Sequence, residues 1–238
     1  MSSRSTAQAP PANRLLECLS RRDRQQLIAQ CDEIELVESH VLCEPGDRIR
    51  HVYFPIGGFI SLITPIDQNA GFEVGLVGCE GVLGVSLVLG VAVAPQRALV
   101  QGAGSALRMP AAAFRRELAH SASLRRVLDR YLYVLMCQLA QTGACTRFHL
   151  LEPRLARWLL MSHDRTSGDS FHLTHEFLGF MLGMRRAGIT VAAGALQKLD
   201  LISYVRGAIT IRDRAGLEAA ACPCYQIDCE SYARMLAC

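Results

Sequence analysis

Two adjacent arginines, Arg185 and Arg186, stand where one short apolar-periodic segment gives way to a second. The sequence has no carboxylate between Glu176 and Asp200, so the pair lacks an acidic neighbour along the chain. Guanidinium groups form planar, bidentate hydrogen bonds with phosphate oxygens and with the major-groove edge of guanine. This pattern favours an anionic partner for the segment.

The surrounding sequence predicts two short helices joined by a glycine turn. Thr174 is expected to cap the first helix, and Gly183 is suited to its left-handed terminus. The second helix is expected to bury four aliphatic residues: Ile189, Ala192, Leu196 and Leu199. The opposite face is expected to point to solvent, with Arg186, Thr190, Ala193 and Gln197. Two helices in this arrangement fit the major groove of DNA.

Downstream, the alternating sequence LISYVRGAITIRD predicts a hairpin with a basic tip at Arg206-Gly207, placed to contact backbone phosphates. The region from Arg147 to Arg214 has ten basic and six acidic side chains, which also favours DNA. The predicted DNA-binding residues are Thr174, Arg185, Arg186, Thr190, Ala193, Gln197 and Arg206.

The elements before this region change from strand to helix. Short β-rich runs separated by turn residues, from Ile34 to Met109, predict an all-β sandwich or barrel. Residues 122–145 predict one helix, about 36 Å long at 1.5 Å per residue. Its apolar stripe consists of Leu124, Val127, Leu128, Tyr131, Leu132, Leu135 and Leu139. Self-association through this stripe is favoured over packing against the β domain, although Gln138 and Thr142 interrupt it.

The chain has 238 residues, half of them hydrophobic and a fifth charged, which favours two folded domains. Residues 1–13 lack the apolar core of a secretory signal and are expected to be a disordered tail. The apolar stretch 74–95 contains Glu80 and five glycines, so buried strands and turns explain it better than a membrane span. A cytoplasmic protein with reduced cysteines and no membrane partner is expected.

Four cysteines lie close together at the end of the sequence: Cys222, Cys224, Cys229 and Cys238. Four thiolates could hold zinc or an iron–sulfur cluster, but this spacing is irregular for either. The favoured interpretation is a terminal segment of reduced, partly buried thiols, some of them sensitive to oxidation. No metal or other cofactor is predicted. Spacing also gives no support for a haem ligand among His40, His51 and His149.

The order of these elements resembles the Crp/Fnr transcription regulators. EPGDRIRHVYFPIGG is similar to the first strands of their cyclic-nucleotide-binding-type β-roll, and LTHEFLGFMLGMRRAGITVAAGALQKLDLI is similar to their DNA-reading motif. The resemblance implies an α+β fold: a jelly-roll-like β-roll sensor domain, a long dimerisation helix and a C-terminal winged helix-turn-helix. The implied parts are a tail (1–13), the sensor domain (14–121), the dimerisation helix (122–146), the DNA-binding domain (147–221) and a Cys-rich tail (222–238).

The resemblance also implies a homodimer on a palindromic DNA site, RNA polymerase as a partner and a small-molecule effector of unknown identity. Arg186 matches the family's base-reading arginine at the start of the second helix. Three other contact positions depart from the family's pattern: Ala187, Gly188 and Val191. The operator sequence of better-known members therefore does not transfer to this chain.

The sensor half departs more from family members that bind cyclic AMP. Their Gly-Glu pair aligns with Gly84-Val85, which removes the carboxylate that holds the ribose. Their Arg-Ser-Ala run aligns with Gln96-Arg97-Ala98, which places the arginine one residue late. A one-residue shift turns Arg97 to the other face of the strand, unless a bulge restores it. The effector-site candidates are Val85, Arg97 and Ala98, and tight cyclic AMP binding is not expected.

Two other classes of function remain open at this point. One is a small-ligand or redox sensor, or an interaction module, whose helical domain does not read DNA. The other is an enzyme, but the sequence contains no phosphate loop, nucleophile elbow or zinc-protease spacing. A DNA-binding regulator is the favoured prediction.

Overall fold

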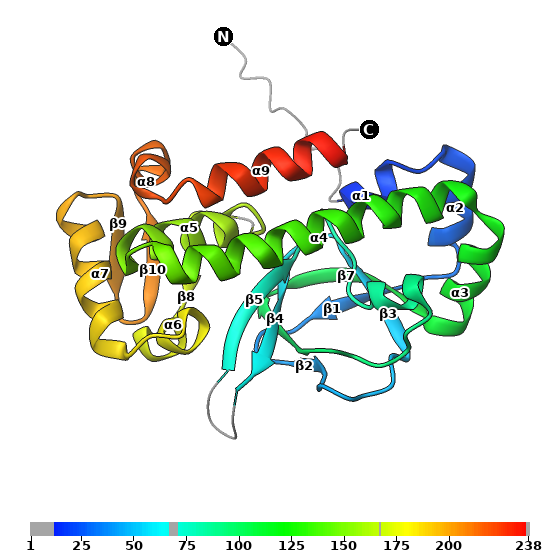
Figure 1. The fold of residues 1–238 in the computed structure, drawn as a ribbon, viewed down its shortest axis with the longest axis horizontal. Helices are drawn as coiled ribbons and strands as arrows, with labels where there is room; N and C mark the ends of the chain where they lie inside the picture. Colours follow the sequence, from blue (N-terminus) through cyan, green and yellow to red (C-terminus); the bar gives the residue numbers. More distant parts are fainter. Residues whose placement is uncertain (1–11, 67–70, 167, 237–238) are drawn as a thin grey trace, which may run out of the picture.

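The computed structural model describes residues 12–66, 71–166 and 168–236. A β-rich domain and a helical domain lie side by side, and one long helix passes along both (Figure 1). Residues 1–11 of the predicted tail lie outside the described residues. Asn13 does not fit that prediction, because it is buried, caps the first helix and donates to the carbonyl oxygens of Pro55 and Gly81, each at 2.9 Å.

The β-rich domain consists of two antiparallel sheets with the strand orders β1-β7-β3 and β2-β6-β4-β5. The strands are β1 (Asp32–Leu36), β2 (Val41–Cys43), β3 (His51–Pro55), β4 (Phe59–Pro65), β5 (Gly71–Val77), β6 (Arg97–Gly102) and β7 (Gly104–Pro110). Alternation along β3 buries Val52 and Phe54, as the period of a half-buried strand requires. Short helices flank the sheets: α1 (Arg14–Glu17), α2 (Arg21–Ile28), the 3-10 helix η1 (Val85–Leu89) and α3 (Ala111–His120).

The apolar stretch 74–95 is confirmed as strand, turns and a short 3-10 helix. Within the described part of the chain, no helix combines the length and the apolar character needed to cross a membrane. Eight of the described cysteines are free thiols, whereas Cys18 is disulfide-bonded.

The long helix α4 (Ala122–Phe148) begins where the Ser121 hydroxyl accepts a hydrogen bond from the Leu124 amide at 3.0 Å. Most of its predicted self-association stripe packs against the β-rich domain instead, since Leu124, Leu128 and Tyr131 are buried in that core. That part of the prediction is therefore wrong. Gln138 is also buried on the inner side of α4, and so does not interrupt an outward-facing surface.

The helical domain contains α5 (Leu151–His163), α6 (His175–Leu182), α7 (Arg186–Lys198) and α8 (Arg214–Ala220). A small sheet of order β8-β10-β9 completes it, with β8 (Ser170–His172), β9 (Ile202–Val205) and β10 (Ala208–Ile211). Apolar side chains from α5, α6 and α7 form one core: Leu155, Trp158, Leu159, Leu178, Ile189, Ala192 and Leu196. Leu199 was predicted to join this core, but it is 62% exposed because α7 ends at Lys198.

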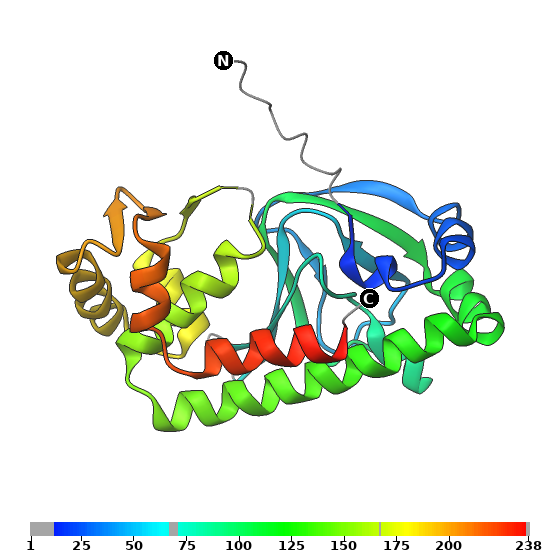
Figure 2. The same cartoon turned by 90° about the horizontal axis from the view of Figure 1, so that it is seen from above.

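The Cys-rich segment forms a helix, α9 (Cys224–Met235), that sequence patterning did not anticipate. It runs back along α4 toward the β-rich domain, as both views show (Figures 1 and 2). A buried ion pair between Asp228 of α9 and Arg157 of α5, at 2.7 Å, fixes it to the helical domain.

The two domains meet along β5. Glu73 of β5 accepts a hydrogen bond from the Trp158 indole nitrogen of α5 at 2.7 Å. In the turn after β5, Glu80 forms an ion pair with Arg165 at 2.7 Å, and both side chains are largely buried. These polar contacts from β5 and the turn after it position the helical domain together with Phe59 and Leu76, which pack into its apolar core.

Candidate nucleic-acid interface

The predicted helix pair is present, and its local signals have the expected roles. Thr174 caps α6, with its hydroxyl oxygen accepting from the Phe177 amide at 3.1 Å. Gly183 ends α6 with φ at 64°, in the left-handed region. A side chain at Gly179 would lie 2.7 Å from the Met184 carbonyl oxygen, so this glycine allows the turn to fold closely against α6.

Arg185 and Arg186 lie at the exposed N-terminal end of α7. Arg185 is the N-cap residue and Arg186 is the first helical residue. Both are exposed, and neither forms an ion pair with any carboxylate that the structure describes. Their guanidinium groups and the positive end of the helix dipole therefore face solvent together.

His175, which the sequence analysis did not single out, connects three elements of this interface. Its Nδ1 lies 2.9 Å from the Thr190 hydroxyl of α7, and its ring stacks on Tyr204 of β9 at 4.1 Å between centroids. Burial, together with the positive charge of Arg186, lowers the pKa of His175. The neutral ring thus packs as a spacer between α6, α7 and the hairpin.

Two of the residues predicted to bind DNA, Ala193 and Gln197, make contacts within the domain. Ala193 is 1% exposed and belongs to the domain core, so it cannot contact a base. Gln197 is exposed, but its side-chain oxygen accepts from the Tyr204 backbone amide at 2.9 Å and holds the hairpin against α7. The error at Ala193 arises from the predicted helix rotation, since the buried face is centred nearer Ala193 than the spacing suggested. Gln197 is exposed as expected, and its role toward DNA stays a prediction.

The apolar residue on the outward face of α7 is Val191, and not Ala193 as the prediction had it. Val191 is 74% exposed, and Ala187 is exposed one turn before it. Together with Arg186 and Thr190 they form the accessible surface of the first half of α7. The hairpin β9–β10 carries Arg206 at its tip, exposed and with φ at 50°.

Comparisons with known proteins agree with this geometry. The model of the Crp-like helix-turn-helix domain matches residues 153–220. FixK2 from Bradyrhizobium japonicum aligns with a TM-score of 0.68 at 13% identity, covering 81% of this chain and 98% of its own. A CRP family transcriptional regulator from Thermus thermophilus aligns with a TM-score of 0.65 at 18% identity, covering 79% and 96%. The chain has the Crp/Fnr regulator fold.

A third similar structure belongs to a regulator named for the molecule to which it responds. The c-di-GMP responsive global regulator CLP of Xanthomonas campestris aligns with a TM-score of 0.63 at 14% identity, covering 81% of this chain and 99% of its own. No curated protein matches the sequence. The resemblance predicted from the sequence is thus confirmed for the fold and for the helix-turn-helix domain.

The β-roll of this Crp/Fnr-type chain contains a cavity of about 530 Å³ beneath α4. Val85 lines the cavity as predicted, together with Leu83, Leu132 and Leu135. Arg97 does not reach it, because this exposed side chain pairs with Glu44 at 2.8 Å on the outer surface.

Ala98 does not line the cavity either, since it is buried in the core between the sheets. No bulge turns the Arg97 side chain inward, although β6 has register irregularities against its neighbours. Two of the three effector-site candidates therefore lie outside the cavity.

Proposed function

We propose that the protein is a homodimeric, sequence-specific DNA-binding transcription regulator with a modified ligand pocket. The observation that supports this most directly is the exposed N-terminal end of α7, where Arg185 and Arg186 face solvent without a carboxylate partner in the described chain. In a helix-turn-helix, this end of the second helix enters the major groove.

The exposed residues divide into base-reading and phosphate-contacting groups. Arg186 is positioned to form a bidentate contact with guanine, and Val191 offers an isopropyl group to a thymine methyl. Thr174 can still donate its hydroxyl hydrogen to a phosphate, since its cap interaction uses only the oxygen. Arg185 and Arg206 complete the phosphate contacts from the turn and the hairpin.

Selection of bound DNA from a random pool tests this function. We expect the wild-type protein to enrich a palindrome that has guanine in each half-site and half-sites about 34 Å apart, one helical turn of DNA. The Arg185→Ala/Arg186→Ala double variant is expected to enrich no motif. Failure of the wild type to enrich any motif would instead favour a sensor or interaction module without specific DNA reading.

A second copy of the chain is expected along the outer face of α4. This face carries Tyr133, Met136, Ala140 and Ala144, all exposed and spaced three, four and four residues apart. Such spacing produces a continuous apolar stripe on one side of a helix. Met136 is 67% exposed in the single chain, which a dimer interface would explain.

Met136→Arg is expected to dissociate the dimer. The change removes apolar surface worth about 1.5–3 kcal/mol per buried side chain, and it places two like charges close to the dimer axis. Sedimentation equilibrium should therefore give the mass of one chain for the variant and of two chains for the wild type. Thr146→Arg, an exposed position off the stripe, is the matched control and should remain dimeric. A dimeric Met136→Arg protein would contradict this interface.

The cavity would let a bound effector act on the proposed dimer interface. Leu132, Leu135, Met136 and Leu139 of α4 line one side of it, so a bound effector would contact the helix that carries the dimer stripe. The other lining residues combine aliphatic side chains with the charged Asp47, Arg48 and Arg50, and Val85 stands where cyclic-AMP binders have their ribose-binding carboxylate. An effector other than cyclic AMP, and RNA polymerase as a partner, are part of this proposal by resemblance to the family.

A further inference from the structure

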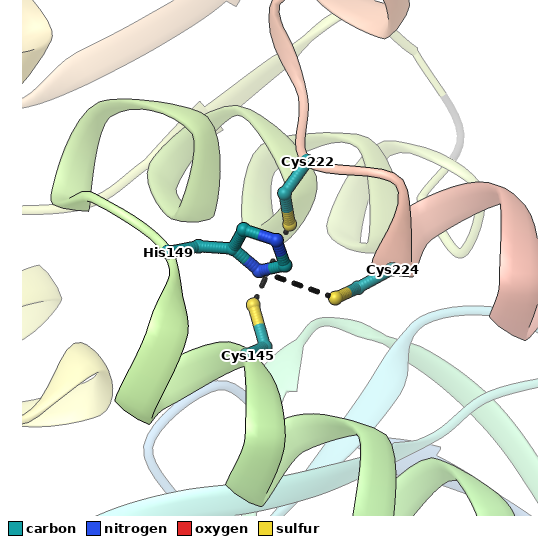
Figure 3. A group of neighbouring side chains, drawn as sticks. All are labelled: Cys145, His149, Cys222 and Cys224. Atoms are coloured by element: carbon teal, nitrogen blue, oxygen red, sulfur yellow. Dashed lines mark hydrogen bonds between the residues drawn. The ribbon is translucent and has the colours of Figure 1, made fainter.

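Three cysteines and a histidine, from segments far apart in the sequence, converge at the end of α4 (Figure 3). Cys145 lies in the last turn of α4, and His149 follows one helical turn later. Cys222 belongs to the link between α8 and α9, and Cys224 is the first residue of α9. Their ligand atoms all lie within 4.8 Å of one another. The sulfurs of Cys145 and Cys222 are 3.4 Å apart, as are the Cys224 sulfur and His149 Nδ1.

These distances fit a single tetrahedral ion. Four ligands at the usual zinc–sulfur distance of about 2.3 Å lie about 3.8 Å from one another. The three thiols are buried and His149 is half-buried, so the ligand set is shielded from solvent. A group of four ligand atoms this compact leaves no room for the several iron and sulfide atoms of a cluster.

The backbone holds the ligands in place. Cys145 and His149 are four residues apart at a helix end, a spacing that puts both side chains on one face. The Cys222 amide donates to the Pro153 carbonyl oxygen at 3.2 Å, which fixes the α8–α9 link against α5. Pro223, between Cys222 and Cys224, is the N-cap of α9 with φ at −59° and restricts the link further.

The surroundings also match a thiolate-rich ion. Three thiolates, a neutral imidazole and Zn²⁺ carry a net charge of −1, and the buried Arg154 and Arg157 of α5 lie close enough to the thiols to interact electrostatically. Gln141 of α4 directs its side-chain amide toward the Cys224 sulfur at 2.9 Å. Outer groups of this kind orient metal ligands and balance their charge.

We propose that Cys145, His149, Cys222 and Cys224 form a structural zinc site. Their four ligands fill a tetrahedron, so the ion has no open position for catalysis. It would join the end of α4, the start of the helical domain and the link to α9. The angle between the helix-turn-helix and the long helix would then depend on metal.

The metal content of the purified full-length chain tests the proposal. We expect about one zinc ion per wild-type chain, because a closed structural site retains its metal through purification. Cys222→Ser and Cys224→Ser should each lose it. Cys229→Ser, a half-buried thiol on α9 outside the cluster, is the matched control and should retain it. Gln141→Leu should keep the site but weaken zinc affinity about 10- to 100-fold.

A second measurement covers variants that fail to fold. Wild-type protein stripped with a chelator is titrated with Co²⁺, whose visible absorption distinguishes tetrahedral thiolate coordination. One equivalent of Co²⁺ should produce the tetrahedral spectrum, and added Zn²⁺ should displace the Co²⁺ and remove this absorption. Wild-type protein with no bound zinc and no cobalt spectrum would overturn the proposal, as would iron with sulfide, or a Cys145–Cys222 disulfide in its place. Equal zinc loss in Cys229→Ser would also contradict it.

Discussion

Replacing Arg186 with alanine is expected to abolish the protein's preference for its own operator while leaving the fold intact. Arg186 is the first residue of α7, is exposed and has no ion-pair partner among the described carboxylates. Its removal therefore breaks no stabilising ion pair within the described chain. It removes the side chain best placed to reach a guanine edge.

The expected loss is large because the proposed dimer would use Arg186 twice, once in each half-site. One bidentate arginine–guanine contact contributes about 1–3 kcal/mol of discrimination. Two half-sites therefore lose about 2–6 kcal/mol, or about 30- to 10⁴-fold in the ratio of specific to non-specific affinity. The ratio is measured by gel shift with the selected operator and a scrambled duplex, and circular dichroism confirms the fold.

Arg206→Ala is the control that distinguishes sequence-specific base contacts from non-specific electrostatic binding to DNA. Arg206 lies at the hairpin tip, where a phosphate contact would not depend on sequence. Loss of the Arg206 side chain should reduce the affinity for both duplexes equally. It should also lower the salt dependence of binding by about one phosphate contact per chain. Unchanged selectivity in Arg186→Ala, or lost selectivity in Arg206→Ala alone, would contradict the assignment of α7 as the reading helix.

Glu73→Gln is expected to change how stability depends on pH. Burial raises the pKa of Glu73 to about 7, although hydrogen bonds from Ser61 and Trp158 partly oppose this shift. The Ser61 hydroxyl contacts both Glu73 and the Gln101 side-chain oxygen, but it has only one hydrogen to donate. A protonated Glu73 resolves this conflict, because it donates to Ser61, which then donates to Gln101.

The direction of the pH effect follows from the raised pKa. Because the folded chain binds this proton more tightly than the unfolded chain, the stabilisation is complete below pH 4.5 and is lost as pH rises through about 7. A shift from 4.5 to about 7 corresponds to about 3 kcal/mol at 1.36 kcal/mol per pH unit. Glutamine keeps an acceptor for Trp158 but does not titrate.

Urea unfolding between pH 4.5 and 8 measures this effect. The free energy of unfolding of the wild type should fall by about 3 kcal/mol relative to Glu73→Gln across this range. Glu33→Gln, which removes an exposed carboxylate on β1, should follow the wild-type profile. Parallel profiles for the wild type and Glu73→Gln would show that Glu73 does not titrate in this window.

The helix-turn-helix was predictable from sequence because its signals are local. Thr174 caps α6, Gly183 ends it and Arg186 begins α7, and each of these positions follows from signals within one helical turn. The orientation of α7 about its own axis was harder to predict from the sequence. It depends on how α5 and the hairpin pack against the helix, and this packing buries Ala193 while exposing Val191.

Spacing along the sequence did not identify the residues of the cysteine–histidine cluster. Cys222 and Cys224 were considered with Cys229 because they are neighbours in the sequence, yet their partners are Cys145 and His149. Cys229 has no place in the group, and Cys238 lies outside the described residues. The true set depends on α9 returning along α4, and no local pattern indicates this tertiary arrangement.

The path of α9 limits how the two domains can move relative to each other. This helix starts at the helical domain, runs beside α4 and ends near α1 of the β-rich domain (Figure 2). A hinge rotation at His149 would therefore have to slide α9 along α4 or separate Asp228 from Arg157. Rotation of the helical domain relative to the β-rich domain is thus restrained by two helices that lie side by side, α4 and α9.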